Sequence, residues 1–146
     1  MPEKIIQRPF ISAFLSLALG AASSAAIALD DLGELQWTNR IILLDARGKS
    51  TNFATDMKAA DIDIVDRDIL WFILDEIGIT TNYAGVVSPQ LTAQIRDEYF
   101  DNQSRVVLVG KDGGIKYRQK SLQLQDIFVR IDAMPMRQRE MQDKAN

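Results

Sequence analysis

The sequence contains neither cysteine nor histidine in its 146 residues. Without a thiol it can form no disulfide, no thiolate metal site and no cysteine nucleophile. Without an imidazole it lacks the commonest general base and the commonest zinc ligand. The two absences exclude a Ser-His-Asp triad, a Cys-His pair, a zincin site and a two-His-one-carboxylate iron site. We therefore predict no metal site, no cofactor and no thiol oxidoreductase activity.

The sequence also lacks a surplus of positive charge. It has 17 Lys and Arg against 20 Asp and Glu, a formal net charge of −3. Because no basic stripe is present to neutralise phosphates, we expect no nucleic-acid partner. The hydrophobic fraction of 47% and the charged fraction of 25% are those of an ordinary globular protein, and the length suits one core.

Residues 1–28 have the pattern of a secretory signal peptide. Lys4 and Arg8 supply a positive n-region, residues 10–22 are apolar, and Ala26-Ile27-Ala28 matches an A-x-A cleavage site. The apolar stretch is shorter than the roughly 20 residues that span a bilayer, and retention as an anchor is the alternative. We expect an exported protein, periplasmic or extracellular, with no membrane association after cleavage and one domain over residues 29–146.

Three continuous apolar runs, at 41–44, 69–74 and 106–109, predict strands buried on both faces. The third run leads into Lys111-Asp112-Gly113-Gly114, a strong hairpin signal, since tight primed turns need positive φ. The alternating run 115–119 then predicts an edge strand with its apolar side chains toward the core.

Apolar residues at helical spacing predict three helices between and after these strands. The first is a single helix that begins near Ser50 or Thr51 and continues to Ile64. The second begins at Ser88-Pro89, because Ser is a good N-cap and Pro is favoured at the first helical position. Residues 75–88 before it are expected to form a long connection.

The third helix follows the hairpin, with Ser121 as its N-cap and its end near Met134, since Pro135 disfavours a helical residue before it. The polar tail after Pro135 is expected to be a solvated helix or a frayed end.

The resulting order, β-α-β-α-β-β-α, predicts an α/β fold. Strand-helix-strand crossovers give parallel pairs, and the closing hairpin adds antiparallel strands. This is the thioredoxin-like layout, a three-layer sandwich with the first strand between the second and third and a carboxyl-terminal hairpin and helix. A ferredoxin-like fold needs the order β-α-β-β-α-β, and an open doubly wound sheet needs more parallel strands.

Several segments of the chain resemble one family. These are Leu35-x-Trp37-x-Asn39-Arg40 before the first strand, Arg67-Asp68-Ile69, the hairpin segment 106–116, and Ile131-Asp132-Ala133-Met134-Pro135-Met136-Arg137-x-x-Glu140-Met141. They resemble the family known as domain of unknown function 4174, over nearly the whole of residues 31–141. Its bacterial members are small exported proteins, and related domains occur in secreted sushi-repeat and extracellular-matrix proteins of animals.

The resemblance implies a thioredoxin-like fold and an extracytoplasmic address, but no established activity and no catalytic residues. Many members have Ala-Pro after the first strand, whereas this chain has Ala46-Arg47. The loop after the first strand thus departs from the family pattern.

That loop is where thioredoxin-like proteins carry their functional groups, and we predict a ligand site in it. The candidate residues are Asp45, Arg47, Lys49, Ser50 and Thr51. Arg47 and Lys49, together with free N–H groups of the next helix, would hold a carboxylate, phosphate or sulfate. The alternative is that Ser50 or Thr51 only caps the helix and that the two cations are solvated.

A run of carboxylates, Asp61, Asp63, Asp66 and Asp68, lacks the mid-loop glycine and terminal glutamate of a calcium loop. We expect it to be a solvated helix terminus.

The leading hypothesis is an exported, non-catalytic, thioredoxin-like binding or interaction module for an unknown small anion or protein partner. One alternative is a thiol-independent enzyme that uses Asp45, Arg47 and Lys49 on an anionic small substrate. Another is a structural or envelope-stress protein held through the tail, residues 134–142.

Overall fold

The structure is a computed structural model that describes residues 26–146. Residues 1–25, which carry most of the predicted signal peptide, lie outside the described part. The elements follow in this order: a 3-10 helix η1 (Leu32–Leu35), β1 (Arg40–Asp45), α1 (Phe53–Ala59), α2 (Asp61–Asp66), β2 (Ile69–Leu74), β3 (Ile79–Thr81), α3 (Pro89–Gln94), a π-helical turn η2 (Ile95–Tyr99), β4 (Val106–Val109), β5 (Ile115–Gln119), α4 (Leu124–Asp132) and α5 (Pro135–Ala145).

The described residues form a mixed α/β fold around one five-stranded sheet of order β3-β2-β1-β4-β5. β1 runs parallel to β2 and antiparallel to β4. The prediction that 41–44 form a central strand between the second and third apolar runs is therefore confirmed. Its four side chains are at most 2% exposed, as expected for a strand covered on both faces.

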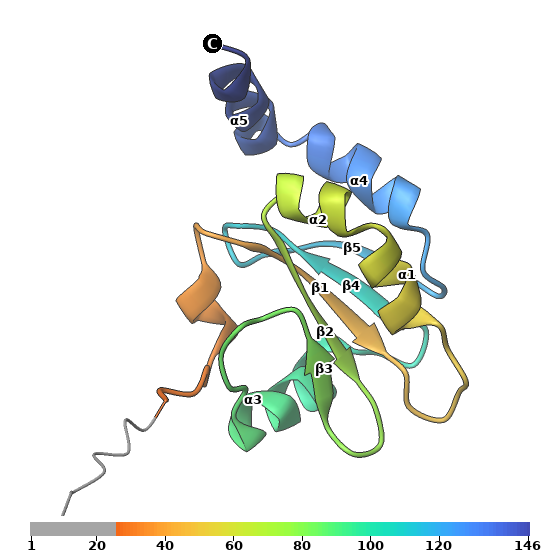
Figure 1. The fold of residues 1–146 in the computed structure, drawn as a ribbon. Coiled ribbons are helices and arrows are strands. Elements are labelled where there is room, and N and C mark those ends of the chain that lie inside the picture. The colour runs from red at the N-terminus through yellow and green to blue at the C-terminus, as the bar shows by residue number, and fades with distance from the viewer. Residues whose placement is uncertain (1–25) are drawn as a thin grey trace, which may run out of the picture.

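Helices cover both faces of the sheet (Figure 1). On one face, Ile42 and Leu44 of β1 pack with apolar residues of α1, α2 and α4. On the other face, Ile41 and Leu43 pack with α3, with η2 and with the segment before β1. Because successive strand residues point to opposite faces, the same short strand supplies both cores.

The carboxyl-terminal hairpin is present as predicted, with β4 inside the sheet and β5 at its edge. Gly110 N–H donates to the Gly114 carbonyl oxygen at 2.9 Å, and Gly113 has a φ of 81°, which glycine adopts without strain. The expected burial of both apolar residues of β5 is wrong in part. Tyr117 packs against the core, but Ile115, beyond a register shift, is 43% exposed.

The predicted connection 75–88 is wrong in part, because it contains the short strand β3, paired antiparallel with β2. The carboxylate of Asp75 accepts hydrogen bonds from the N–H groups of Ile77 and Gly78 and so reverses the chain. The side chain of Asn82, just after β3, continues the hydrogen bonding between β3 and β2. It accepts from Trp71 N–H at 2.8 Å and donates to the Ile69 carbonyl oxygen.

Two helix starts were also predicted too early. The first helix begins at Phe53, not at Ser50 or Thr51, and it breaks at Ala60 into α1 and α2. The last predicted helix begins at Leu124, with Gln123 and not Ser121 as its N-cap, and the Gln119 side chain holds both the N–H and the C=O of Gln123.

Ser88 and Pro89 are the N-cap and first residue of α3 as predicted, and the Ser88 hydroxyl accepts from Leu91 N–H at 3.0 Å. Pro135 lies just beyond α4 and also opens α5, so the polar tail is a helix. No helix within residues 26–146 is long and apolar enough to cross a membrane.

We predict that Ile42→Ala lowers the free energy of unfolding by about 2–5 kcal/mol, because the fully buried side chain leaves a cavity between β1 and the helices. Urea denaturation followed by circular dichroism measures the loss. The control is Ile77→Ala, which removes a side chain that is 97% exposed and should change stability by less than about 0.5 kcal/mol. Similar losses in the two variants would contradict the assignment of β1 as the centre of the core.

Candidate functional site

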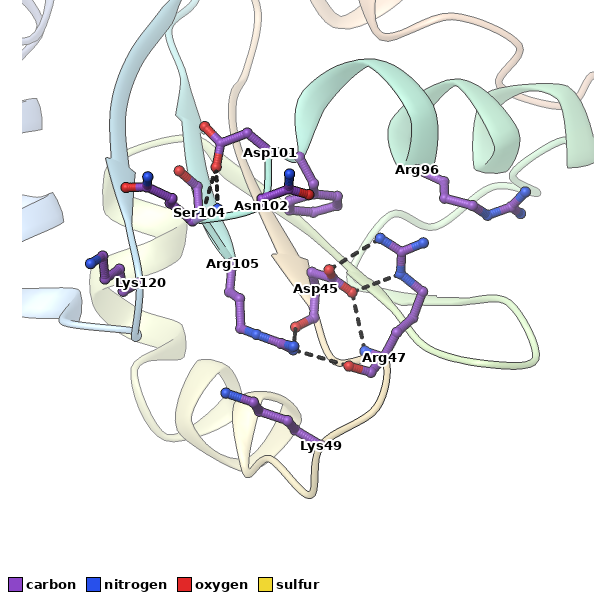
Figure 2. Close-up of a pocket in the computed structure, with 11 residues that line it drawn as sticks. Asp45, Arg47, Lys49, Arg96, Asp101, Asn102, Ser104, Arg105 and Lys120 are labelled. Atoms are coloured by element: carbon purple, nitrogen blue, oxygen red, sulfur yellow. Dashed lines mark hydrogen bonds and ion pairs between the residues drawn. The ribbon is translucent and has the colours of Figure 1, made fainter.

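An open hollow of about 670 Å³ lies at the carboxyl end of β1. Because β1 and β4 are antiparallel, the end of β1 meets the start of β4, and Asp45 N–H donates to the Arg105 carbonyl oxygen at 2.8 Å. The end of β5 pairs with the start of β4, which brings Lys120 to the same edge of the sheet. The hollow is therefore built from segments far apart in sequence (Figure 2).

Three of the five predicted site residues, Asp45, Arg47 and Lys49, line this hollow. Ser50 and Thr51 do not line it. They do not cap α1 either, since the N-cap is Asn52, and its side chain makes no capping hydrogen bond. α1 has seven residues and begins beyond the loop, so we do not assign its N–H groups to the site.

Asp45 and Arg47 form a bidentate ion pair within the loop after β1. The guanidinium donates from Nε to Oδ1 at 2.8 Å and from a terminal nitrogen to Oδ2 at 3.1 Å, and the Arg47 backbone N–H also donates to Oδ1. Burial by itself raises the pKa of Asp45, but these hydrogen bonds and the nearby charges of Arg47 and Arg105 outweigh it, so the pKa is lowered. Asp45 is therefore an ionised, fully engaged carboxylate.

Arg105 also holds the loop after β1, through hydrogen bonds to backbone carbonyl oxygens and not through an ion pair. One of its terminal nitrogens donates to the carbonyl oxygens of Asp45 at 3.1 Å and of Arg47 at 3.0 Å. It pairs with no carboxylate within residues 26–146. Carbonyl oxygens orient a guanidinium but do not neutralise it, so this cation is held in place and remains available to an anion.

Three further cations line the hollow from three different segments: Lys49 after β1, Arg96 in η2 and Lys120 after β5. Each is exposed, and each lacks an ion-pair partner in the described part of the chain. With Arg47 and Arg105 they make five cations, against the two carboxylates of Asp45 and Asp101. We call this the cationic hollow. Its lining residues carry three surplus positive charges on a chain whose formal net charge is −3, and Glu76 and Asp97, which do not line it, act electrostatically on Arg47 from nearby.

A rigid loop before β4 forms the opposite side of the hollow. Oδ1 of Asp101 accepts hydrogen bonds from Gln103 N–H at 2.8 Å and from Ser104 N–H at 2.6 Å. These bonds, with a weaker effect from Arg118, lower the pKa of Asp101. The turn leaves the side chains of Asn102 and Ser104 lining the hollow (Figure 2). Gln103 lines it as well.

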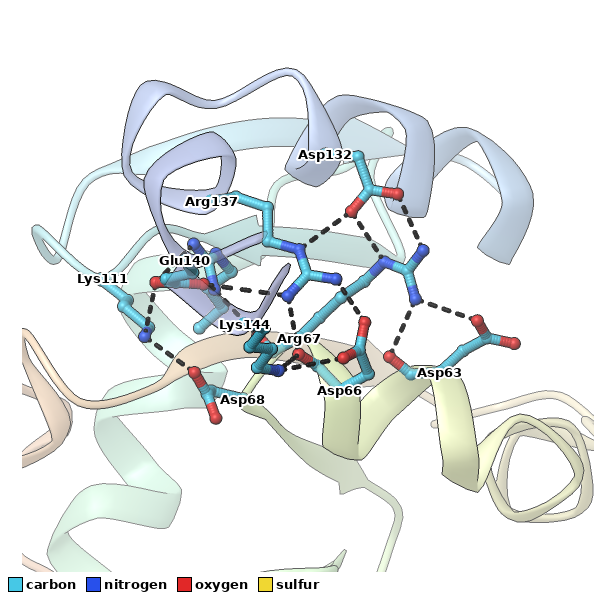
Figure 3. A network of polar contacts seen from close by, with 10 residues as sticks. Asp63, Asp66, Arg67, Asp68, Lys111, Asp132, Arg137, Glu140 and Lys144 are labelled. Carbon is cyan, nitrogen blue, oxygen red and sulfur yellow. Dashed lines mark hydrogen bonds and ion pairs between the residues drawn. The ribbon is translucent and has the colours of Figure 1, made fainter. Parts of the chain in front are cut away.

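A second charged cluster lies at the opposite end of β1, where α5 contacts β1, α2 and α4 (Figure 3). We call it the charge network. Its members are Arg40, Asp63, Asp66, Arg67, Asp68, Lys111, Asp132, Arg137, Glu140 and Lys144.

The centre of the charge network is Arg40, which is only 1% exposed. Its two terminal nitrogens donate to the two carboxylate oxygens of Glu140 at 3.1 and 3.2 Å, and one of them also donates to the Arg67 carbonyl oxygen. The buried Nε has no acceptor within residues 26–146. Lys111 joins Glu140 at 2.8 Å and Asp68 at 2.9 Å, which ties the β4–β5 turn to α5.

The outer part of the charge network joins α2, α4 and α5. Asp132 accepts from Arg67 at 2.7 Å and from Arg137 at 3.1 Å, while Arg137, only 3% exposed, also pairs with Asp66. Lys144 adds a further contact to Asp66 at 3.0 Å. Guanidinium groups suit such multiple, planar contacts with carboxylates.

The expectation that 61–68 end in a solvated carboxylate cluster is confirmed for Asp61, Asp63 and Asp68, which are exposed, while Asp66 is half-buried. The sequence did not predict their ion pairs, in which Asp63 pairs with Arg67, Asp66 with Arg137, and Asp68 with Lys111. The tail is likewise more than a frayed end, because its residue Glu140 pairs with Arg40 and its residue Arg137 pairs with Asp66. The one available signal was that most of the network residues stand in the motifs that carry the family resemblance.

Burial and pairing compete in setting the pKa values of the network carboxyls. Burial alone raises the pKa of Glu140, but Arg40 and Lys111 outweigh it, so the pKa lies below its ordinary 4.5. Asp132 behaves in the same way with Arg67 and Arg137. For Asp66 the hydrogen bond from Lys144 is the largest cause, and its pKa is below 3.8. No group of three or more Asp, Glu, His or Cys side chains among the described residues could hold a metal ion.

The sequence profile of a family described as "Domain of unknown function (DUF4174)" matches residues 31–140. Since this is most of the chain, the protein belongs to that family. No curated protein and no solved structure matches the chain.

We predict that acid destabilises the protein through the charge network. The folded-state pKa values of Asp66, Asp132 and Glu140 are lowered, so the unfolded chain binds protons first as the pH falls. The contribution of these groups is complete above about pH 4.5 and is lost as the pH falls through their folded-state values. Urea denaturation at several pH values measures the slope.

In the same series, Glu140→Gln should lower the free energy of unfolding at pH 7 by about 3 kcal/mol, because it leaves the buried Arg40 without a counter-charge. It should also flatten the acid slope. Glu98→Gln is the control, since Glu98 is exposed and its only side-chain hydrogen bond within residues 26–146 is from the Gln94 amide. An unchanged acid slope in Glu140→Gln would show that the network does not govern acid stability.

Proposed function

We propose that this member of the DUF4174 family is an exported, non-catalytic binding module with a thioredoxin-like fold, and that it binds an anion in the cationic hollow. The observation that carries the proposal is the surplus of three positive charges around one hollow of an acidic protein. Opposite charge in a concave site concentrates an anionic ligand and speeds its association.

The strand order supports the thioredoxin-like assignment. β1 lies between a parallel neighbour, β2, and an antiparallel neighbour, β4, and the β4–β5 hairpin is followed by α4. β3 is an addition at the far edge. In this assignment the hollow occupies the loop after the first strand, the place where the fold carries its functional groups.

The state of Asp45 favours a binding role over the alternative enzyme. A general base needs a free carboxylate with a pKa near the working pH. Both oxygens of Asp45 accept from Arg47, and its pKa is lowered, so it is a weak base. Asp45 instead orients Arg47, which leaves the other terminal nitrogen of that guanidinium for a ligand.

The proposed export is supported by the boundary of the packed chain. Ala26 and Ile27 are exposed, the latter to 90%, whereas Leu29 is 2% exposed and packs in the core. Leu29 N–H also donates to the Val86 carbonyl oxygen at 2.8 Å. Cleavage after Ala28 would therefore remove only residues that precede the core.

We predict that the protein recovered from the extracytoplasmic fraction of a bacterial host lacks residues 1–28 and begins at Leu29. Intact-mass measurement and amino-terminal sequencing test this. Ala28→Lys should block cleavage, because signal peptidase needs a small residue there, while Asp30→Lys serves as the charge control. Recovery of the uncleaved chain in the membrane fraction would favour a retained anchor.

We predict that inorganic phosphate shifts the amide NMR signals of the loop after β1 and the loop before β4. Lys49→Ala with Lys120→Ala should weaken phosphate binding about tenfold, a loss of roughly 1.4 kcal/mol. Added sodium chloride should weaken it further by screening. Equal affinity in the double variant and the parent would refute the site.

The matched control for this measurement is Lys58→Ala with Arg139→Ala. It removes the same charge from two exposed positions that do not line the hollow. An equal loss of affinity in both double variants would mean that net charge alone, and not the hollow, attracts phosphate.

A further inference from the structure

The cationic hollow is larger than a single inorganic ion requires. Its volume of about 670 Å³ lies in the range of roughly 300–1,000 Å³ that is typical of pockets for small organic molecules. Its cations also come from separate segments, with Lys49 after β1, Arg96 in η2 and Lys120 after β5. A ligand that uses more than one of them must extend across the hollow.

The lining offers hydrogen-bond acceptors as well as cations. Asn102, Gln103 and Ser104 follow one another along one side of it. The side chains of Asn102 and Gln103 make no hydrogen bond within residues 26–146, although the two N–H groups of Gln103 and Ser104 are held by Asp101. Ser104 is buried, and its side chain also hydrogen-bonds to Asp101. The loop is thus fixed by its backbone, and its two amide side chains remain free.

Free amide side chains indicate a ligand that both donates and accepts. Lys and Arg only donate, so they satisfy a phosphate or carboxylate, which only accepts. Asn and Gln also present acceptor oxygens, which a bare anion leaves unused. A sugar hydroxyl is both donor and acceptor and matches them. Phe100 is the only purely hydrocarbon side chain of the lining, so an extended apolar ligand has little to contact.

Resting on the proposed function, we infer that the ligand of the cationic hollow is an acidic saccharide, a polyhydroxylated molecule with a phosphate or carboxylate group. The cations bind the acidic group, and the side chains of Asn102 and Gln103 bind ring hydroxyls. The same chemistry occurs in a free sugar phosphate and in a uronic-acid polymer, and the experiment compares both.

The exported protein is titrated by isothermal calorimetry with inorganic phosphate, acetate, glucose, glucose 6-phosphate, glucuronate, an oligogalacturonate and an oligoglutamate. Glucose 6-phosphate should bind at least tenfold more tightly than phosphate, and glucuronate more tightly than acetate, while glucose alone should not bind measurably. Tighter binding of the oligogalacturonate than of glucuronate would identify a polymer as the preferred source of the ligand.

The deciding variant is Asn102→Ala with Gln103→Ala, two exposed side chains whose removal leaves the backbone turn intact. It should abolish the tenfold advantage of glucose 6-phosphate over inorganic phosphate, with both affinities measured on the same variant. The control, Gln125→Ala with Gln138→Ala, removes two exposed amides outside the hollow and should change neither affinity.

The outcomes separate the inference from the proposed function. If phosphate binds but glucose 6-phosphate binds no more tightly, or if the Asn102 and Gln103 variant keeps the advantage, the saccharide inference is overturned and anion binding stands. If no anion binds, both fall. Tighter binding of oligoglutamate than of any saccharide would overturn the inference in favour of an acidic protein partner.

Discussion

The structure depends on one buried ion pair, because the cation of Arg40 needs a counter-charge inside the protein. Arg40 begins the apolar central strand and is almost inaccessible to water, so its charge has to be met from within the chain. A buried ion pair adds little net stability over an apolar pair, but leaving one partner unpaired is costly. Glu140 supplies the counter-charge from α5, one hundred residues away in sequence. The position of the last helix therefore follows from the first residue of β1.

The two ends of β1 differ in their charge balance. This difference distinguishes the charge network, which holds the fold together, from the cationic hollow, which is the proposed binding site. At the Arg40 end, the charge network has five cations and five carboxylates, so it is neutral and internally satisfied. At the Asp45 end, the lining has five cations and two carboxylates, and four of the cations have no ion-pair partner in the described chain. The balanced cluster stabilises the fold, whereas the unbalanced one is the basis for the proposed anion site.

The sequence predicted what is local and left out what is tertiary. The apolar run 41–44 was enough to place a central strand, and Asp112-Gly113-Gly114 was enough to place the hairpin, since both are encoded in neighbouring residues. β3 was missed because its pairing depends on the Asp75 and Asn82 side chains, which resemble ordinary loop residues until they meet β2. The strand propensity of neighbouring residues does not predict such side-chain contacts.

The candidate site shows the same limit. Asp45, Arg47 and Lys49 share one loop and were predicted from it, but Arg96, Arg105 and Lys120 reach the hollow only through the pairing of β1, β4 and β5. In sequence these three residues are isolated cations with no pattern. Ser50 and Thr51 were included because a helix was expected to begin beside them, and the later start at Phe53 removes the reason for their inclusion.

The positions of the family motifs explain why membership of this family does not assign an activity to the chain. Arg40, Arg67, Asp68, Lys111, Asp132, Arg137 and Glu140 all stand in the segments that carry the resemblance, and all belong to the charge network. The free cations Lys49, Arg96 and Lys120 stand outside those segments. The motifs therefore identify how α5 and the sheet are held together. The cations of the hollow stand outside the motifs, so the proposed anion binding depends on residues outside the segments that carry the family resemblance.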